Sequence, residues 1–256
     1  MSASYRVLRG QAWAHVLCSA IGPAGEDIGG WLSEHTQVLK QDEHSQVGLL
    51  QLAGELCYLK LYRPRSTLQQ LRFRLGRGRA VQNFDSTAAL RTAAVPVPEA
   101  RACLLAPGGM LLLAQGIAQA SDVHTLLQRG CPGEMQENIL RQAAHALARL
   151  HQQGFAHGDC KWSNMLWAQE KFYLVDLDAV VAARVGSARQ ARDLARFTLN
   201  AEEQALQPSV YEKFLQEYLQ LMSLSRQDLM RAMLPPLQKL RLRHQLRYGN
   251  RGQRLV

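Results

Sequence analysis

Strand-like and helix-like patterns occupy different parts of this 256-residue chain. Three short β-prone runs lie between residues 36 and 62, whereas apolar residues at helical spacing dominate after Gly116. Separation of strands from helices along a chain is typical of α+β folds rather than of alternating α/β folds. We therefore expect a β-rich N-terminal part, a mainly helical C-terminal part and a junction near residues 115–121.

The N-terminal part contains the signals of a small sheet with one helix. In the run ELCYLKLY, Leu56, Tyr58 and Lys60 share one face, because side chains alternate along a strand. A helical pattern follows and ends before Pro96, which cannot continue a helix. The predicted segments are strands over 36–41, 46–52 and 55–62, a helix over 79–94, and a hairpin of 99–106 with 110–115.

The C-terminal part is predicted to be helical around one further strand. Asp122 is a candidate N-cap for a short helix that ends near Leu127, and Gly154 is expected to end a long helix that starts at Pro132. The run KFYLVDLDAVV, residues 171–181, is typical of a strand. Further helices are predicted over 187–199, 208–222 and 225–244.

The chain is basic, with a formal net charge of +9 and a pI of about 9.6. Such an excess favours an anionic partner, which could be nucleic acid, a phospholipid surface or a phosphorylated substrate. Two runs contain arginine or lysine and no acid; their cations are Arg63, Arg65, Arg72, Arg74, Arg77 and Arg79, then Lys239, Arg241, Arg243, Arg247, Arg251 and Arg254. A charge run is most often a solvated face, and no nucleic-acid motif accompanies these two.

Cysteine usage and hydropathy indicate a cytoplasmic protein. The five cysteines are scattered, without CxxC or metal-ligand spacing, as is typical of reduced thiols. We expect no signal peptide, because His15 interrupts the only apolar stretch near the N-terminus. The richest apolar stretch, residues 103–120, is too short and too often interrupted to span a bilayer, so any membrane association is predicted to be peripheral.

Four polar residues have the order and spacing required for phosphoryl transfer. The reaction needs a cation on the nucleotide phosphates, acidic and amide ligands for magnesium, and a carboxylate near the acceptor hydroxyl. Lys60 lies on a predicted strand, Asp159 and Asn164 lie in one loop with four residues between them, and Asp176 follows the apolar residues FYLV. Each alone has an ordinary explanation, since Asp159 and Asn164 can cap a turn and a strand lysine is usually solvated.

The motif HGDCKWSN, residues 157–164, followed by VDLD, resembles the protein-kinase-like superfamily. Within it, the sequence most resembles the bacterial lipopolysaccharide core kinases, the Kdo/heptose kinase group, over roughly residues 36–200. The narrower resemblance rests on the small size, on DLD in place of DFG, on the stretch ALRTAAVPVPEA and on the missing glycine-rich loop.

The resemblance implies a role for each motif residue. Asp159 would accept or orient the acceptor hydroxyl, Lys161 would neutralise the γ-phosphate, and Lys60 would contact the α- and β-phosphates of ATP. Magnesium would be held by Asn164, Asp176 and Asp178, the last of which replaces the glycine of DFG. His157, Cys160 and Trp162 are interpreted as scaffolding, and Asp193 is either an anchor for the loop backbone or an ordinary helix acid.

The resemblance also implies a bilobal protein-kinase-like fold in a single domain. An antiparallel sheet would form an N-lobe of about residues 1–115, and helices a C-lobe of about 116–256 with a basic tail from about 237. The expected reaction is ATP- and Mg²⁺-dependent phosphorylation of a heptose or Kdo hydroxyl in the lipid A–core oligosaccharide. Basic patches would bind the anionic cytoplasmic face of the inner membrane, with about 1 kcal/mol per well-placed cation.

Two departures from the kinase pattern leave alternatives open. The first hairpin loop, residues 42–45, has no glycine, whose small size lets backbone amides approach phosphates closely. The acid expected to pair with Lys60 is Asp85, Glu55 or missing. The alternatives are a small-molecule kinase of the aminoglycoside or choline type, and a catalytically silent kinase-like binding protein at a membrane.

Overall fold

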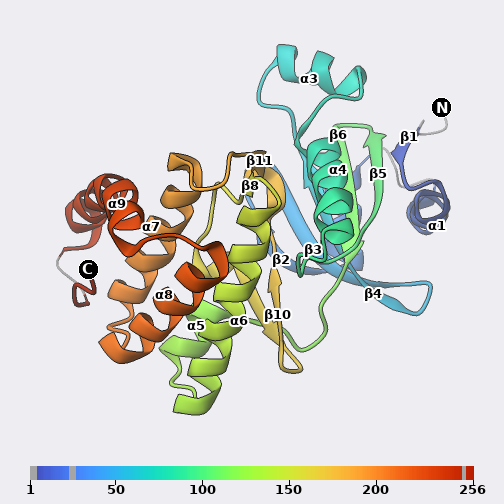
Figure 1. Cartoon of the computed structure of the whole chain (residues 1–256). Helices are drawn as coiled ribbons and strands as arrows, with labels where there is room; N and C mark the ends of the chain where they lie inside the picture. The colour runs from blue at the N-terminus through green and yellow to red at the C-terminus, as the bar shows by residue number, and fades with distance from the viewer. Residues whose placement is uncertain (1–4, 23–26, 250–251) are drawn as a thin grey trace. The chain divides into compact units, whose positions relative to one another are not determined.

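The β-prone runs of the N-terminal part form one antiparallel sheet. In a computed structural model that describes residues 5–22, 27–249 and 252–256, the chain forms two units (Figure 1). Unit 1 comprises residues 1–89 and 98–118, and unit 2 comprises residues 90–97 and 119–256. The sheet of unit 1 has the strand order β1-β5-β6-β4-β3-β2. Its strands are β1 Arg6–Arg9, β2 Gln37–Gln41, β3 Ser45–Leu52, β4 Glu55–Tyr62, β5 Ala100–Ala106 and β6 Gly109–Gln115.

Alternation along the strands gives this sheet two apolar faces. Leu59 and Leu61 on β4 are buried in the cluster that includes residues of α1 (Gln11–Ile21) and α2 (Ile28–His35). Tyr62 belongs to a second cluster with residues of α3 (Thr67–Arg74) and α4 (Arg79–Thr92). Because side chains alternate, Lys60 lies on the same face of β4 as Tyr62.

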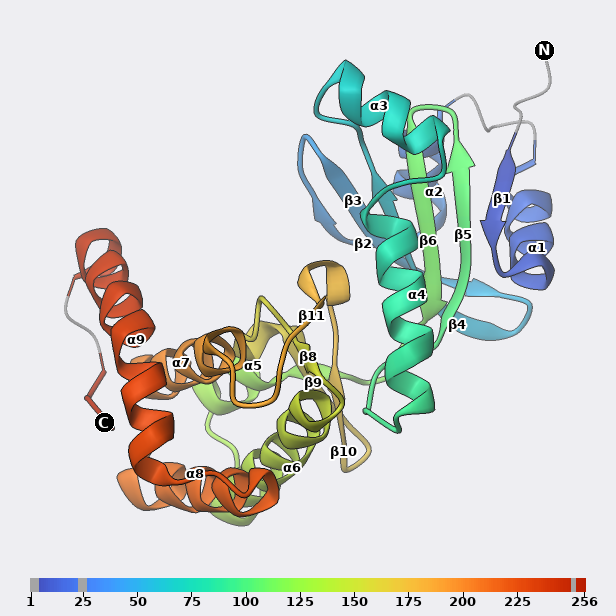
Figure 2. The same cartoon turned by 45° about the horizontal axis from the view of Figure 1, so that its top comes forward.

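The helices of unit 1 were predicted only in part. The helix expected at 79–94 is α4, but α1, α2 and α3 were not anticipated. Ser66 caps α3 by accepting a hydrogen bond from the Gln69 amide at 3.2 Å. In Figures 1 and 2, α3 stands at the end of unit 1 where β4 and α4 are joined. The first arginine run therefore spans α3, its flanking loops and the first residue of α4.

Unit 2 is built on five α-helices that share one core. Two pairs of these helices pack against each other: α6 (Gly133–Gln152) with α8 (Pro208–Met222), and α7 (Ala188–Glu203) with α9 (Arg226–Tyr248). Aromatic residues fill this core: Phe197 of α7 stacks on Phe214 of α8 at a centroid distance of 4.1 Å, and Trp162 meets Phe197 edge-on. The helices are α5 Val123–Gln128, α6 Gly133–Gln152, α7 Ala188–Glu203, α8 Pro208–Met222 and α9 Arg226–Tyr248.

Short strands in unit 2 hold the polar loops. One sheet has the order β10-β9-β7 and another pairs β11 with β8. The strands are β7 Ser121–Asp122, β8 Phe155–Ala156, β9 Met165–Ala168, β10 Lys171–Leu174 and β11 Val181–Ala182. The prediction of one strand over 171–181 was wrong beyond Leu174, because Asp176 adopts a left-handed conformation with φ 57° and a 3₁₀ turn follows it.

No helix in the described ranges is long and apolar enough to cross a membrane.

Candidate active site

The loop His157–Asn164 connects β8 to β9 and ends in a 3₁₀ turn at Trp162–Asn164. Gly158 has φ 79°, and a Cβ atom there would lie 2.4 Å from the Ala179 carbonyl oxygen. Glycine is therefore the residue that fits this position without moving the backbone. The loop and the segment around Asp176 are also joined directly, since the Val175 amide donates to the Asn164 carbonyl at 3.0 Å.

Asp193 on α7 fixes the start of the loop. Its buried carboxylate accepts from the His157 amide at 2.6 Å and from the Gly158 amide at 2.9 Å. His151 Nε2 lies 3.3 Å from Asp193 Oδ2, and the other ring nitrogen of His151 bonds to the Tyr218 hydroxyl. Of the two interpretations of Asp193, the structure supports the backbone anchor.

His157 is buried and braces the loop from inside. Its Nε2 lies 3.1 Å from the Val175 carbonyl oxygen, and its Nδ1 lies 3.4 Å from the Asp159 amide. A neutral imidazole with its proton on Nε2 satisfies both partners. Burial lowers the pKa of His157 below its usual value, which favours this neutral form.

Three side chains hold the carboxylate of Asp159. Arg196 Nη1 lies 2.9 Å from Oδ1, while Lys161 Nζ and Asn164 Nδ2 each lie 3.0 Å from Oδ2. Asp159 remains 28% exposed, so a small molecule can still reach it. The carboxylate is thus oriented by two cations and an amide while staying accessible.

The side chain of Asn164 is oriented by Asp159. Its amide nitrogen donates to the carbonyl oxygen and to Oδ2 of Asp159, and its Oδ1 accepts no hydrogen bond from the described residues. An oxygen of this kind suits Mg²⁺, which takes one or two carboxylates, water and substrate phosphates rather than a full protein cage. Asp176 and Asp178 follow Asn164 by 12 and 14 residues. Within the described ranges, no group of three or more His, Cys, Asp or Glu side chains is arranged so that it could hold a metal ion by itself.

Sequence reasoning missed two residues of α7 that contact the loop. Arg196 binds Asp159, and Asn200 Oδ1 accepts from the Trp162 amide at 2.8 Å. Residues 193, 196 and 200 share one face of a helix, because positions i, i+3 and i+7 are neighbours. One face of α7 therefore contacts the start, the carboxylate and the end of the loop. The spacing from Asp193 was the available signal for the other two.

Cys160 and Trp162 serve packing, as interpreted. Both side chains are fully buried, and Trp162 lies against Phe197. Burial raises the pKa of the Cys160 thiol well above its usual value, so the thiol stays protonated and unreactive.

An arginine row extends along the exposed side of α7. Arg189, Arg192 and Arg196 are spaced i, i+3 and i+7, so neighbours in the row have Cβ atoms about 5–6 Å apart. Arg189 donates to the Ala182 carbonyl at 2.9 Å, and Arg192 is exposed with no side-chain partner in the part of the chain described. A cationic strip thus leads along α7 to Asp159.

Lys60 belongs to unit 1, whereas the other five predicted site residues belong to unit 2. It is paired with Val47 on β3 and Leu112 on β6, and its ammonium lies 4.9 Å from the centroid of the Tyr62 ring. The two acids considered as its partners bind arginines instead: Asp85 pairs with Arg9, and Glu55 pairs with Arg101.

Comparison with known proteins shows the family of this chain. The profile of the "Lipopolysaccharide kinase (Kdo/WaaP) family" matches residues 31–218, most of the chain. The chain belongs to this family. Of the solved structures, "WaaP in complex with acyl carrier protein" is similar at a TM-score of 0.57 and 16% identity, over 84% of this chain and 89% of that one. A search of curated protein sequences finds no match.

Membership of this kinase family and the similar structure confirm the predicted α+β protein-kinase-like fold. The family resemblance stated from the motif residues is confirmed as well. The helical C-terminal part and the antiparallel sheet of the N-terminal part agree with that fold.

The loop between β2 and β3 differs from a glycine-rich phosphate loop. Asp42 Oδ1 accepts from the amides of His44 and Ser45 at 2.9 and 2.8 Å. These hydrogen bonds lower the pKa of the Asp42 carboxyl, and the one from the His44 amide has the largest effect. The loop amides are therefore bound by the loop's own carboxylate and are not available to a phosphate.

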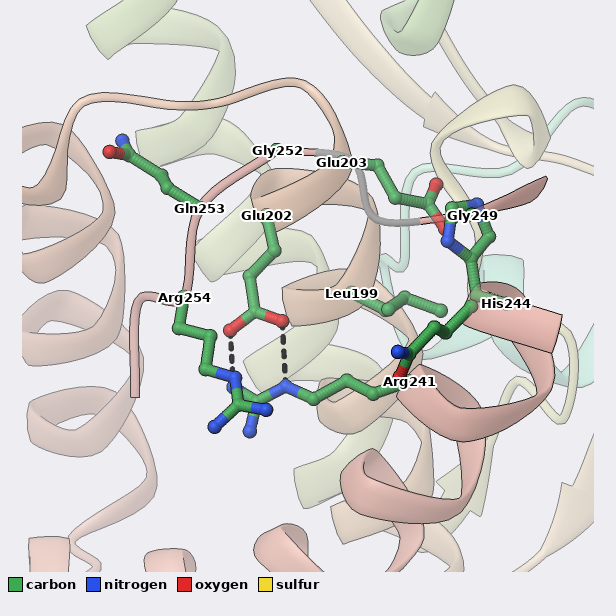
Figure 3. A pocket seen from close by; sticks show the side chains of 10 residues that line it. Leu199, Glu202, Glu203, Arg241, His244, Gly249, Gly252, Gln253 and Arg254 are labelled. Atoms are coloured by element: carbon green, nitrogen blue, oxygen red, sulfur yellow. Dashed lines mark hydrogen bonds and ion pairs between the residues drawn. The ribbon is translucent and has the colours of Figure 1, made fainter.

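The basic tail is partly used to hold the chain end in place (Figure 3). Arg241 forms an ion pair with the buried carboxylate of Glu202, with Nε 2.8 Å from Oε2, and His244 pairs with Glu203. These residues line a cavity of about 410 Å³. Arg241 is therefore not a free surface cation, and Arg251 of the predicted patch lies outside the described residues.

Replacing Asp193 with Asn should loosen the start of the loop. A neutral amide keeps the size but loses the charge of an acceptor that serves two backbone amides, and hydrogen bonds to charged groups contribute about 1.5–3 kcal/mol each. We expect faster hydrogen exchange at the amides of residues 157 and 158 and a lower free energy of unfolding. The exposed Asp228→Asn is the matched control; equal effects in both variants would contradict the anchoring role.

The neutral His157 should make stability depend on pH. Its pKa is lower in the folded than in the unfolded chain, so only the unfolded chain gains this proton as pH falls through about 6.5. The free energy of unfolding should therefore drop below that pH, by at most about 1.4 kcal/mol per pH unit from this group. Urea unfolding between pH 7.5 and 5 should show a smaller slope for His157→Gln than for the wild type; equal slopes would exclude His157 as the source.

Proposed function

We propose that the protein transfers the γ-phosphate of ATP to a heptose or Kdo hydroxyl of the lipopolysaccharide inner core, at the cytoplasmic face of the inner membrane. The observation that carries the proposal is the Asp159 carboxylate, held by Arg196, Lys161 and Asn164 yet still partly exposed. Family membership supports phosphate transfer, and the two units would act together as one kinase domain.

Asp159 would receive the acceptor hydroxyl. A carboxylate that orients the hydroxyl, and accepts its proton as the phosphorus–oxygen bond forms, contributes through positioning and general-base catalysis. Lys161 is 41% exposed and has three donors, of which the Asp159 contact uses one, so it can also donate to a phosphate oxygen. Arg196 keeps the other carboxylate oxygen in place.

Lys60 would contact the α- and β-phosphates of ATP, as its position in the family pattern implies. Magnesium, when bound, would neutralise phosphate charge, and the residues proposed to hold it are Asn164, Asp176 and Asp178. The fit rests on the Oδ1 of Asn164, which accepts no hydrogen bond from the described residues, and on the oxygen ligand that each of the three side chains can offer. Because the loop amides of residues 44 and 45 are already bound, phosphate binding depends on these side chains.

Asp159→Asn tests the mechanism. The variant keeps the shape of the side chain but loses the charge that takes up the hydroxyl proton, so transfer should fall by about two to four orders of magnitude. The assay uses labelled ATP and dephosphorylated lipopolysaccharide core oligosaccharide, with mass spectrometry of the product. Wild-type turnover in the variant would refute the role of Asp159.

A thermal-shift experiment separates this proposal from a silent binding protein. A ligand that binds only the folded state raises stability, so Mg·ATP should raise the Tm of both the wild type and Asp159→Asn. No shift for the wild type would favour the silent alternative. Transfer to an aminoglycoside or choline, with none to the core oligosaccharide, would favour the small-molecule kinase.

The arginine row on α7 supports an anionic acceptor. Arg192→Gln removes one unpaired cation of the row without touching Asp159, and a charge-assisted hydrogen bond of about 1.5 kcal/mol corresponds to roughly tenfold in affinity. We expect the KM for the carboxylate-bearing core oligosaccharide to rise about tenfold, with kcat unchanged. Arg129→Gln, an exposed arginine after α5, is the control. An equal rise in KM for the methyl-esterified oligosaccharide would show that Arg192 does not bind the acceptor carboxylates.

A further inference from the structure

Helix α3 and its C-cap residue Leu75 expose three leucines. Leu68, Leu71 and Leu75 are 66%, 54% and 63% exposed, although large apolar side chains are usually buried. Their spacing of i, i+3 and i+7 puts them on one side of the helix, where together they form a continuous apolar strip. They make up a third of the nine large hydrophobic side chains that are exposed in the described residues.

The opposite side of α3 attaches the helix to unit 1. Phe73 is 3% exposed and belongs to the buried cluster with Tyr62 and Met110. Positions 73 and 71 differ by two residues, or about 200° around the helix axis, so the leucines point away from the sheet when Phe73 packs on it. The leucine strip is therefore presented outward by a helix that is attached to unit 1 through Phe73 on its other side.

Unpaired arginines surround the strip. No acid occurs between Arg63 and Arg79, and five side chains of this run are exposed without a hydrogen bond or ion pair to any described residue. They are Arg65, Arg72, Arg74, Arg77 and Arg79. Asp85 lies near three of these arginines but is paired with Arg9. An exposed apolar strip flanked by cations is complementary to the phosphates and the acyl-chain boundary of an anionic membrane.

We propose that α3 docks the protein on an anionic phospholipid surface. The three leucines would enter the boundary between headgroups and acyl chains, while the arginines bind lipid phosphates. A bilayer suits this site because it accepts an outward-facing apolar strip without a complementary groove, and the surrounding charge selects anionic lipid. The inference rests on the proposed function in one respect: an acceptor that is a glycolipid explains why the protein would work at a membrane.

Vesicle co-sedimentation tests the proposal on the full-length protein. Wild-type protein should bind vesicles that contain phosphatidylglycerol and should bind vesicles of pure phosphatidylcholine far more weakly. The double variant Leu68→Gln/Leu71→Gln should bind at least tenfold more weakly, and Arg72→Gln/Arg74→Gln should reduce binding mainly at low salt, where charges are least screened. Leu39→Gln, a 51%-exposed leucine on β2 of the same unit, is the matched control and should bind like the wild type.

Three results would overturn the proposal. One is unchanged binding of the leucine variant to anionic vesicles; another is equal binding of the wild type to both kinds of vesicle. The third is self-association of the wild type, measured by sedimentation velocity, that is lost in the leucine variant while vesicle binding is unchanged. The strip would then bind a second copy of the protein. Circular dichroism of each variant establishes that it is folded.

Failure of the anchor and failure of the proposed function give different results. Transfer to deacylated, soluble core oligosaccharide needs no membrane, so wild-type protein that transfers phosphate but ignores anionic vesicles refutes only the anchor. Wild-type protein that binds these vesicles through Leu68 and Leu71 but phosphorylates no core acceptor refutes only the proposed function.

Discussion

The two hydrogen bonds from the amides of His157 and Gly158 to the buried Asp193 carboxylate are the contact on which the site depends. They fix where the loop starts, and the Gly158 conformation then directs the chain toward Asp159. Asn200 holds the Trp162 amide near the end of the same loop. A rigid α-helix thus defines the position of a short polar loop, whose own hydrogen bonds then orient Asp159.

Much of the fold could be predicted from periodicity and turn signals. Strands β3 and β4, helix α4, the β5–β6 hairpin and helix α8 lie where the patterns placed them, because their apolar faces are buried. Strand β2 was also predicted, although all of its residues are exposed. Helix α3 was missed because its leucines face solvent and its other residues are mostly polar, so no inward-facing apolar pattern marks it. The strand around Asp176 was overextended because apolar residues continue through a left-handed turn.

The candidate site was predictable where the chemistry is local in sequence. Asp159, Lys161 and Asn164 lie within six residues, and their contacts follow from the loop itself. Arg196 and Asn200 come more than thirty residues later and reach the loop only through the packing of α7. In the sequence, only their helical spacing from Asp193 points to these contacts. The acidic partner of Lys60 was uncertain because it too depends on packing between segments that are distant in the chain.

The self-contained turn at Asp42 has a consequence for ionic strength. In kinases whose loop amides bind the nucleotide phosphates, part of the attraction comes from backbone dipoles and depends little on salt. Here the amides of His44 and Ser45 are bound to Asp42 instead. Nucleotide attraction then rests on full side-chain charges and a divalent ion, which are screened within a Debye length of about 8 Å at physiological salt. Under the proposed function, ATP affinity would respond to salt and free magnesium concentration more steeply than in kinases with a glycine-rich loop.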